Sequence, residues 1–266
     1  MHGTREHLRL RTRKPRERFA FAGLLVAFVA FYVVCLSVAE VSFSKLWAGL
    51  PRLGNWAARA WPPDFSEIGI LSYRAAETVA MGTIGTSFGV LIAVPVCLLA
   101  ARNTAPVAWL SIPARFLLNV LRGIDSFIFA LIFVAAVGLG PFAGVLGVAL
   151  HSAGSIAKLW AETIETAERG PIEAVIMSGA SRLKVVRYAL IPDVLPSLAS
   201  SSLYMWEWSI RASTVLGVVG AGGIGQELKN SVDLLLFDRV LTILLIVLVM
   251  VTVIDSVSAW LRRRLI

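Results

Sequence analysis

The amino-acid sequence predicts an all-α polytopic membrane protein, with about six transmembrane helices and both termini in the cytoplasm. The composition is 57% hydrophobic and 16% charged, with a mean hydropathy of +0.77, far from the average of soluble domains. Apolar runs long enough to cross a bilayer recur along the chain. Basic residues concentrate in alternate connecting segments, as expected of loops that stay in the cytoplasm. The net charge of +8 therefore reflects orientation in a membrane rather than nucleic-acid binding.

The first part of the chain combines a basic start, one anchoring helix and an amphipathic segment. Residues 1–18 hold seven of the 25 lysines and arginines and are expected to be cytoplasmic. Residues 19–39 form an apolar run longer than the core of a signal peptide, so a retained first transmembrane helix is expected, with cleavage after residues 37–39 as the alternative. Residues 40–75 are Trp-rich and are expected on the extracytoplasmic surface of the membrane.

The transmembrane domain is expected over residues 76–261, followed by a basic C-terminus at residues 262–266. Its first helix carries Gly82, Gly85 and Gly89 at three- and four-residue spacing, which lets neighbouring helices approach closely. Two cysteines in apolar runs, Cys35 and Cys97, are interpreted as small hydrophobic residues. The helices expected in this domain are residues 77–101, 116–137, 142–159, 197–219 and 240–261.

A polar stretch at residues 162–196 interrupts this domain and is predicted to hold two short cytoplasmic helices. Pro171 suits the first position of the first helix, and Glu173 then falls in its first turn. Gly179 is expected to end that helix. The second helix is expected to stop at Pro192 and Pro196. It is also expected to carry a basic face made of Arg182, Lys184 and Arg187.

This polar stretch resembles the EAA loop of bacterial ABC importer permeases. The family pattern is Glu-Ala-Ala, three residues, Gly, nine residues, Ile, one residue, Leu-Pro, and four residues fall in register: Glu173, Ala174, Gly179 and Pro192. Three positions depart from it conservatively, at Val175, Ala189 and Ile191. The resemblance implies that the loop forms coupling helices that dock into a cleft of a cytoplasmic ATPase. Arg182, a candidate for this coupling surface, is expected with Lys184 and Arg187 either to pair with acidic residues of the ATPase or to lie against lipid headgroups.

A wider resemblance covers roughly residues 77–255. The runs FVAAVGLGPFAGVLGVALHSAGSIAKLWAE and RASTVLGVVGAGGIGQEL are similar to the phosphonate-type permease, the membrane subunit of phosphonate, phosphite or phosphate importers. This resemblance implies a multi-pass protein of the bacterial inner membrane. It also implies three protein partners: ATPase subunits that bind ATP and Mg, an extracytoplasmic substrate-binding protein, and a second copy of the chain. No cofactor is expected on this chain itself. The alternative to a phosphorus oxyanion is that the importer carries another small solute.

Import of a phosphorus oxyanion requires charge compensation within the membrane. Arg211, one turn after Glu207, is the first candidate for the substrate pathway, and Arg122 and Lys158 are the others. The alternative is structural: Glu207 and Arg211 neutralise each other, while Arg122 and Lys158 extend to the headgroups.

A glycine-rich turn follows the fifth expected helix and is interpreted as a gate or hinge. Its GxGxxG-like string lacks the strand and soluble helix that dinucleotide binding requires. The sequence also lacks a catalytic or metal-binding constellation, so no enzymatic reaction is expected. The glycines of this turn are Gly220, Gly222, Gly223 and Gly225.

Two other classes of function are less consistent with the sequence. A secondary transporter would be expected to have similar halves, and no internal repeat is evident. A membrane-tethered DNA-binding hairpin is disfavoured because the basic patch at 182–187 is small and lies between two spans.

Overall fold

The computed structural model describes residues 15–105 and 107–265, apart from the side chains at 15–20, 22, 108, 182 and 265. Throughout these residues all regular secondary structure is helical, which confirms the predicted all-α class. The chain divides into two compact units, residues 1–56 and residues 57–266. Most of the basic start predicted at 1–18 lies outside the described residues.

The first unit holds α1, Pro15–Val38, and most of α2, Phe43–Arg59. The apolar part of α1, Gly23–Val38, meets α2 at an angle of 45°. The two helices differ in the distribution of their polar residues. The apolar residues of α1 are spread around the whole helix, whereas α2 carries Lys45, Arg52 and Arg59 at seven-residue spacing, two helical turns apart. That spacing places the three cations in one line, so the amphipathic segment predicted over 40–75 includes a regular amphipathic helix.

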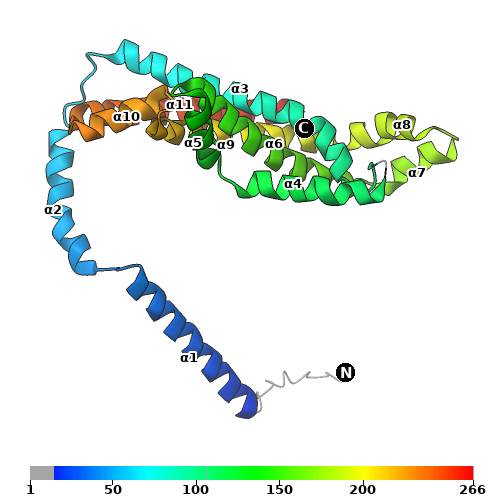
Figure 1. Cartoon of the computed structure of the whole chain (residues 1–266), viewed down its shortest axis with the longest axis horizontal. Coiled ribbons are helices and arrows are strands. Elements are labelled where there is room, and N and C mark those ends of the chain that lie inside the picture. The colour runs from blue at the N-terminus through cyan, green and yellow to red at the C-terminus, as the bar shows by residue number, and fades with distance from the viewer. Residues whose placement is uncertain (1–14, 106, 266) are drawn as a thin grey trace, which may run out of the picture. The chain divides into compact units, whose positions relative to one another are not determined.

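The second unit is a bundle built around α3, Ile68–Ala100, and α6, Pro141–Glu165 (Figure 1). Glycines allow these helices to approach closely. A Cβ atom placed on Gly85 would lie 2.7 Å from Val148, and one on Gly89 would lie 2.7 Å from Ser152. The prediction that this glycine-rich helix packs inside a bundle is therefore confirmed, although α3 begins well before residue 77 and α6 extends beyond residue 159.

The third predicted transmembrane helix, residues 116–137, is wrong as a single helix. The chain forms α4, Ser111–Gly123, and α5, Ser126–Val137, which meet at 87°. Asp125 caps α5, since its Oδ1 accepts a hydrogen bond from Phe127 N at 2.8 Å. An aspartate that bonds the backbone in this way competes with a continuous helix, and the apolar run concealed that signal.

The polar stretch folds into the predicted hairpin at one end of the bundle (Figure 1). It begins with α7, Arg169–Met177, two residues earlier than expected, so Pro171 is the third residue and Glu173 lies beyond the first turn. Gly179, with φ of +76°, ends the helix as predicted. The second helix comprises α8, Arg182–Val185, and the π-helical turn η2, Val186–Leu190.

The prolines do not stop the second helix, contrary to the prediction. The π-helical turn leads directly into α9, Ile191–Leu216, which has Pro192 in its first turn and Pro196 inside it. In this wide turn Ile191 N donates to Val186 O, five residues back. The shifted hydrogen-bond register accommodates a proline that a regular helix would exclude.

The opposite end of the bundle contains a helix that the sequence interpretation did not include. After the short 3₁₀ turn η3, Gly217–Val219, come α10, Gly223–Asp233, and α11, Phe237–Leu265. Glu227 on α10 pairs with Arg74 at 3.4 Å and with Arg239 at 2.9 Å, so this short helix is tied by ions to α3 and α11.

Three helices among the described residues are long and apolar enough to cross a membrane: α3, α6 and α11. The count rises to five if the bent pairs α1–α2 and α4–α5 each form one span. The long helix α9 does not belong to this set, and its polar residues Asp193, Glu207 and Arg211 explain why.

Candidate functional site

Arg211, the first candidate for the substrate pathway, lies in an ion network between α9 and α11. Its Nη2 donates to Glu207 Oε1 at 2.8 Å, and its Nη1 donates to Asp255 Oδ1 at 3.1 Å. Arg262 Nη2 donates to the other oxygen of Glu207 at 3.1 Å. Two cations and two carboxylates thus balance one another. This arrangement supports the structural alternative for Glu207 and Arg211.

Asp255 and Arg262 were not among the predicted site residues. The signal that would have found Asp255 is a carboxylate within the apolar sixth predicted span, since such a residue almost always has a partner or a function. Its seven-residue separation from Arg262 places both on one face of α11.

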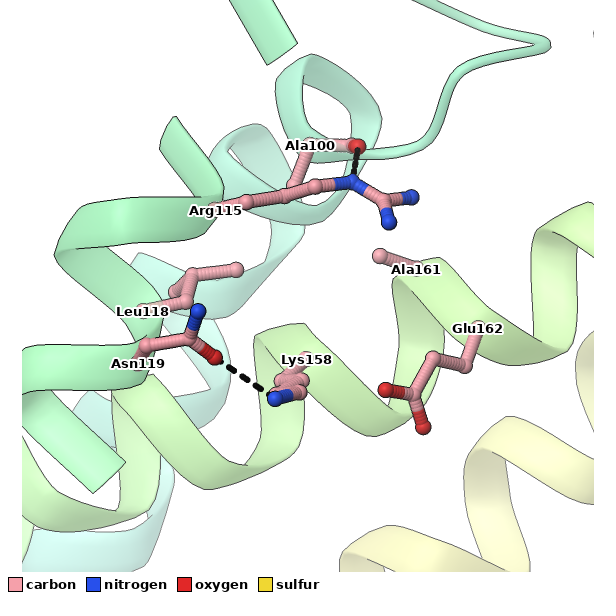
Figure 2. Close-up of a pocket in the computed structure, with 7 residues that line it drawn as sticks. All are labelled: Ala100, Arg115, Leu118, Asn119, Lys158, Ala161 and Glu162. Atoms are coloured by element: carbon pink, nitrogen blue, oxygen red, sulfur yellow. Dashed lines mark hydrogen bonds between the residues drawn. The ribbon is translucent and has the colours of Figure 1, made fainter. Parts of the chain in front are cut away.

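Lys158 lies in a pocket of about 130 Å³ between α4 and α6, at the hairpin end of the bundle. Its Nζ donates to Asn119 Oδ1 at 2.6 Å, and Arg115 Nε donates to Ala100 O at 2.9 Å (Figure 2). Arg115 also pairs with Glu165. Both cations therefore already bind protein acceptors, although Lys158 remains partly exposed within the pocket.

Arg122 differs from the other candidates because its side chain is exposed and makes no ion pair with any described residue. It lies at the end of α4, directly before the bend into α5. Gly154 sets the depth of this bend, since a Cβ atom placed there would lie 2.8 Å from Arg122 N, and Gly154 is near the middle of α6. The bend therefore places Arg122, which has no ion-pair partner among the described residues, level with the middle of α6.

His151 supports the bend from α6. Its Nδ1 lies 2.9 Å from Ile124 O, so this nitrogen carries the proton and donates it to the free carbonyl at the break. The imidazole also stacks on Trp208 of α9 with ring centroids 4.7 Å apart. His151 is therefore a packed, hydrogen-bonded residue of the bundle.

The site residues predicted for the pathway thus form two groups. Arg122 and Lys158 belong to the α4–α6 contact, whereas Glu207 and Arg211 join α9 to α11. The carboxylate of Asp125, beside Arg122, is exposed and caps the next helix.

The hairpin presents the residues of the predicted coupling surface. Glu173 and Ala174 are exposed on α7, Pro192 is exposed at the start of α9, and the side chain of Arg182 lies outside the described residues. Two apolar side chains at the tip of the hairpin project into solvent, with Met177 87% and Leu183 78% exposed. Solvent-exposed apolar groups at the tip of a polar hairpin favour a protein partner there.

The glycine-rich turn is conformationally demanding. Gly220, Gly222 and Gly223 have φ of +86°, +79° and +70°, which side-chain-bearing residues rarely adopt. A Cβ atom on Gly225 would lie 1.7 Å from Thr214 O, so that glycine is required by packing. The first amides of α10 are held by α3, because Ile224 N donates to Thr78 Oγ1 at 2.9 Å.

Within the described part of the chain no cluster of three His, Cys, Asp or Glu residues could hold a metal ion. The described residues form an α-helical bundle with three to five candidate membrane spans and a polar hairpin at one end, an arrangement that fits a membrane protein. Residues 80–266 match the family of binding-protein-dependent transport system inner membrane components, and the chain belongs to this family.

The chain is also similar to individual transport proteins and to solved structures. The chain is 51% identical over 249 residues to the putative phosphite transport system permease protein HtxC of Stutzerimonas stutzeri, covering 94% of this chain and 87% of the relative. It is 39% identical over 250 residues to the phosphate-import permease protein PhnE of Mycolicibacterium smegmatis, covering 94% of this chain but 46% of that relative. A structure of the MetNI methionine ABC transporter in an inward-facing conformation shares the fold, with a TM-score of 0.66, 23% identity and coverage of 76% of this chain and 99% of that one.

Proposed function

We propose that this chain is the permease subunit of an ATP-driven importer for phosphite or a related phosphorus oxyanion, phosphonate or phosphate. Its similarity to permeases named for phosphite and phosphate carries the substrate class. The unpaired guanidinium of Arg122 at mid-span agrees with an anionic substrate, since a phosphorus oxyanion inside a membrane requires a cation. The chain itself catalyses no reaction, and ATP and Mg bind to the partner ATPase.

In the proposed mechanism, two copies of the chain enclose the pathway in the bacterial inner membrane. An extracytoplasmic binding protein delivers the anion, and ATPase subunits engage the hairpin from the cytoplasm. Arg122 contacts the anion during passage, and Lys158 does so nearer the cytoplasm. The Glu207–Arg211 network holds α9 to α11, and the glycines of the turn at 220–225 act as a hinge beside α10.

In the proposed orientation within the membrane, the hairpin and both termini lie in the cytoplasm. The basic residues of the hairpin and of the C-terminus, Arg262 to Arg264, support this placement because cytoplasmic segments retain positive charge. With this orientation α10 and the glycine-rich turn face the binding protein.

The substrate class is tested by ATPase stimulation. The permease would be purified with its ATPase, placed in nanodiscs and mixed with its binding protein and one of four solutes: phosphite, methylphosphonate, phosphate or methionine. At least one phosphorus oxyanion should raise ATP hydrolysis above the rate measured with the binding protein alone. Stimulation by methionine alone would instead favour import of another small solute.

A further inference from the structure

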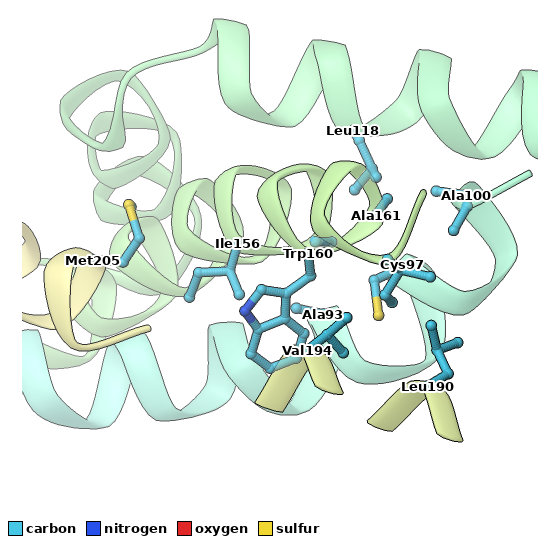
Figure 3. Packing of buried hydrophobic residues seen from close by; sticks show 13 residues of the cluster. Ala93, Cys97, Ala100, Leu118, Ile156, Trp160, Ala161, Leu190, Val194 and Met205 are labelled. Atoms are coloured by element: carbon cyan, nitrogen blue, oxygen red, sulfur yellow. The ribbon is translucent and has the colours of Figure 1, made fainter. Parts of the chain in front are cut away.

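An apolar groove of about 340 Å³ runs along the side of the bundle between α3 and α9. Val94 and Leu98 line it from α3, Trp160 from α6, and Leu195 and Leu198 from α9. The groove is open, since Val94 is 47% and Leu195 55% exposed. Figure 3 shows Trp160 packed among Cys97 and Val194, which also line the groove. In a membrane this opening faces acyl chains.

The groove changes from apolar to basic along one helical face. Lys184, Arg187, Ile191 and Leu195 follow one another at spacings of three or four residues, so they lie on one face of the continuous helix α8–η2–α9. Ile191 and Leu195 line the groove, whereas Lys184 and Arg187 are exposed beyond its hairpin end. On the other wall, Leu98 is followed by the exposed Arg102, just past the end of α3.

One nearby carboxylate, that of Glu165, interacts with the charge of Arg102. Glu165 is taken by Arg115 and by the backbone N–H of Arg102, and Asp193 accepts a hydrogen bond from Glu168 N. Neither Lys184 nor Arg187 forms an ion pair with a described residue. The guanidinium of Arg187 lies over the Tyr188 ring, 5.8 Å from its centroid, which leaves its N–H groups available to an anion.

We propose that this groove is a binding site for an anionic phospholipid of the cytoplasmic leaflet. One acyl chain occupies the groove, and Lys184, Arg187 and Arg102 bind the headgroup phosphate. A basic patch at the cytoplasmic end of an intramembrane groove matches such a lipid in charge and in polarity. A free phosphate ion would leave the apolar part empty. The inference rests on the cytoplasmic placement of the hairpin in the proposed function but not on the transported substrate.

A lipid in this position would contact both α3 and the helix that continues from the hairpin. It would therefore hold α9 against α3 at the point where movements of the hairpin enter the membrane. Lys184 and Arg187 are then directed to the lipid rather than to the ATPase, which leaves Glu173, Ala174 and the tip for protein docking.

Trp160 provides the probe, because its indole lines the groove and is fixed by hydrogen bonds of 3.1 Å to Leu198 O and Ser201 Oγ. The permease would be placed in phosphatidylcholine nanodiscs that contain a small fraction of phosphatidylglycerol with brominated acyl chains, which quench nearby indoles. The difference in emission between the wild type and Trp160→Phe isolates this tryptophan. Brominated phosphatidylglycerol should quench it at fractions at which brominated phosphatidylcholine does not.

The double variant Lys184→Gln, Arg187→Gln should require a roughly thirtyfold higher fraction of brominated phosphatidylglycerol for the same quenching of Trp160. Each cation near a membrane surface contributes about 1 kcal/mol to the binding of an anionic lipid. The control variant Arg169→Gln, Lys229→Gln removes the same charge elsewhere and should behave as the wild type. Mass spectrometry of the intact wild-type protein, which should retain phosphatidylglycerol, provides a second readout if Trp160→Phe does not fold.

Three results would overturn the inference. Equal quenching by both brominated lipids would mean that the groove holds only bulk lipid. No quenching by either lipid would mean that protein, such as a second copy, covers the groove. Quenching by phosphatidylglycerol that is unchanged in the Lys184, Arg187 variant would remove the basic site. If the wild-type complex bound phosphatidylglycerol in this way but imported no phosphorus oxyanion, only the proposed function would be contradicted.

Discussion

Two arginines of the bundle differ in their surroundings, and that difference is the basis of the different roles proposed for them. Arg211 is held by Glu207 at 2.8 Å and Asp255 at 3.1 Å, so an incoming anion would have to compete with two carboxylates. Arg122 is exposed beside the α4–α5 bend and has no ion-pair partner among the described residues. A guanidinium without a carboxylate is the better ligand for an anion.

The variant Arg122→Gln should reduce oxyanion uptake by roughly tenfold or more while leaving thermal stability nearly unchanged, because a hydrogen bond to a charged group contributes about 1.5–3 kcal/mol. The matched variant Arg211→Gln should lower the unfolding temperature, since it removes a partner of Glu207, whose side chain is only 15% exposed. Uptake and thermal unfolding would be measured on both purified variants. Normal uptake by Arg122→Gln would remove that residue from the pathway.

At the scale of single elements, the hairpin depends on a turn that only glycine adopts easily. Gly179 has φ of +76° with open space around it, so substitution acts through backbone strain alone. Gly170, in α7, also has open space but no positive φ, which makes it a matched control.

Gly179→Ala should strain the hairpin by about 1–2 kcal/mol and weaken assembly with the ATPase, whereas Gly170→Ala should not. Co-purification of the tagged permease with its ATPase measures this effect. Equal recovery of the ATPase with both variants would argue against the hairpin as the docking surface.

Local signals in the sequence were sufficient to predict some elements and not others. The hairpin was predictable because Gly179 marks a turn, and α3 was predictable because Gly82, Gly85 and Gly89 mark a packed face. The α4–α5 bend was missed because the break signals at Gly123 and Asp125 lie inside one stretch that is apolar enough to be interpreted as a single span. The continuation past Pro192 was missed because it depends on a π-helical turn, which has no simple sequence pattern.

The site was less predictable than the fold, for a related reason. The Glu207–Arg211 pair follows from helical spacing alone, and the structure contains it. Asp255 and Arg262 reach the same pair from another helix, so only tertiary packing reveals that Arg211 is neutralised. Likewise, only the structure shows that Arg122 forms no ion pair with any described residue.

At the scale of the whole bundle, the two ends carry different structural elements. One end carries the polar hairpin with exposed Met177 and Leu183, and the other carries α10 with its glycine-rich turn and the ion network of Arg74, Glu227 and Arg239. A transport cycle requires this polarity, since energy is supplied on one side and substrate on the other. The mid-span bend at Arg122 lies between the two ends.

The decisive measurement is uptake of radiolabelled phosphite, methylphosphonate and phosphate into proteoliposomes that contain the permease and its ATPase. The binding protein and solute would be added outside, with ATP or a non-hydrolysable analogue enclosed. Import of a phosphorus oxyanion is predicted to require both enclosed ATP and the binding protein, and to be lost with Arg122→Gln. Uptake of all three solutes at the background rate by a complex that hydrolyses ATP and imports another solute would contradict the proposed function.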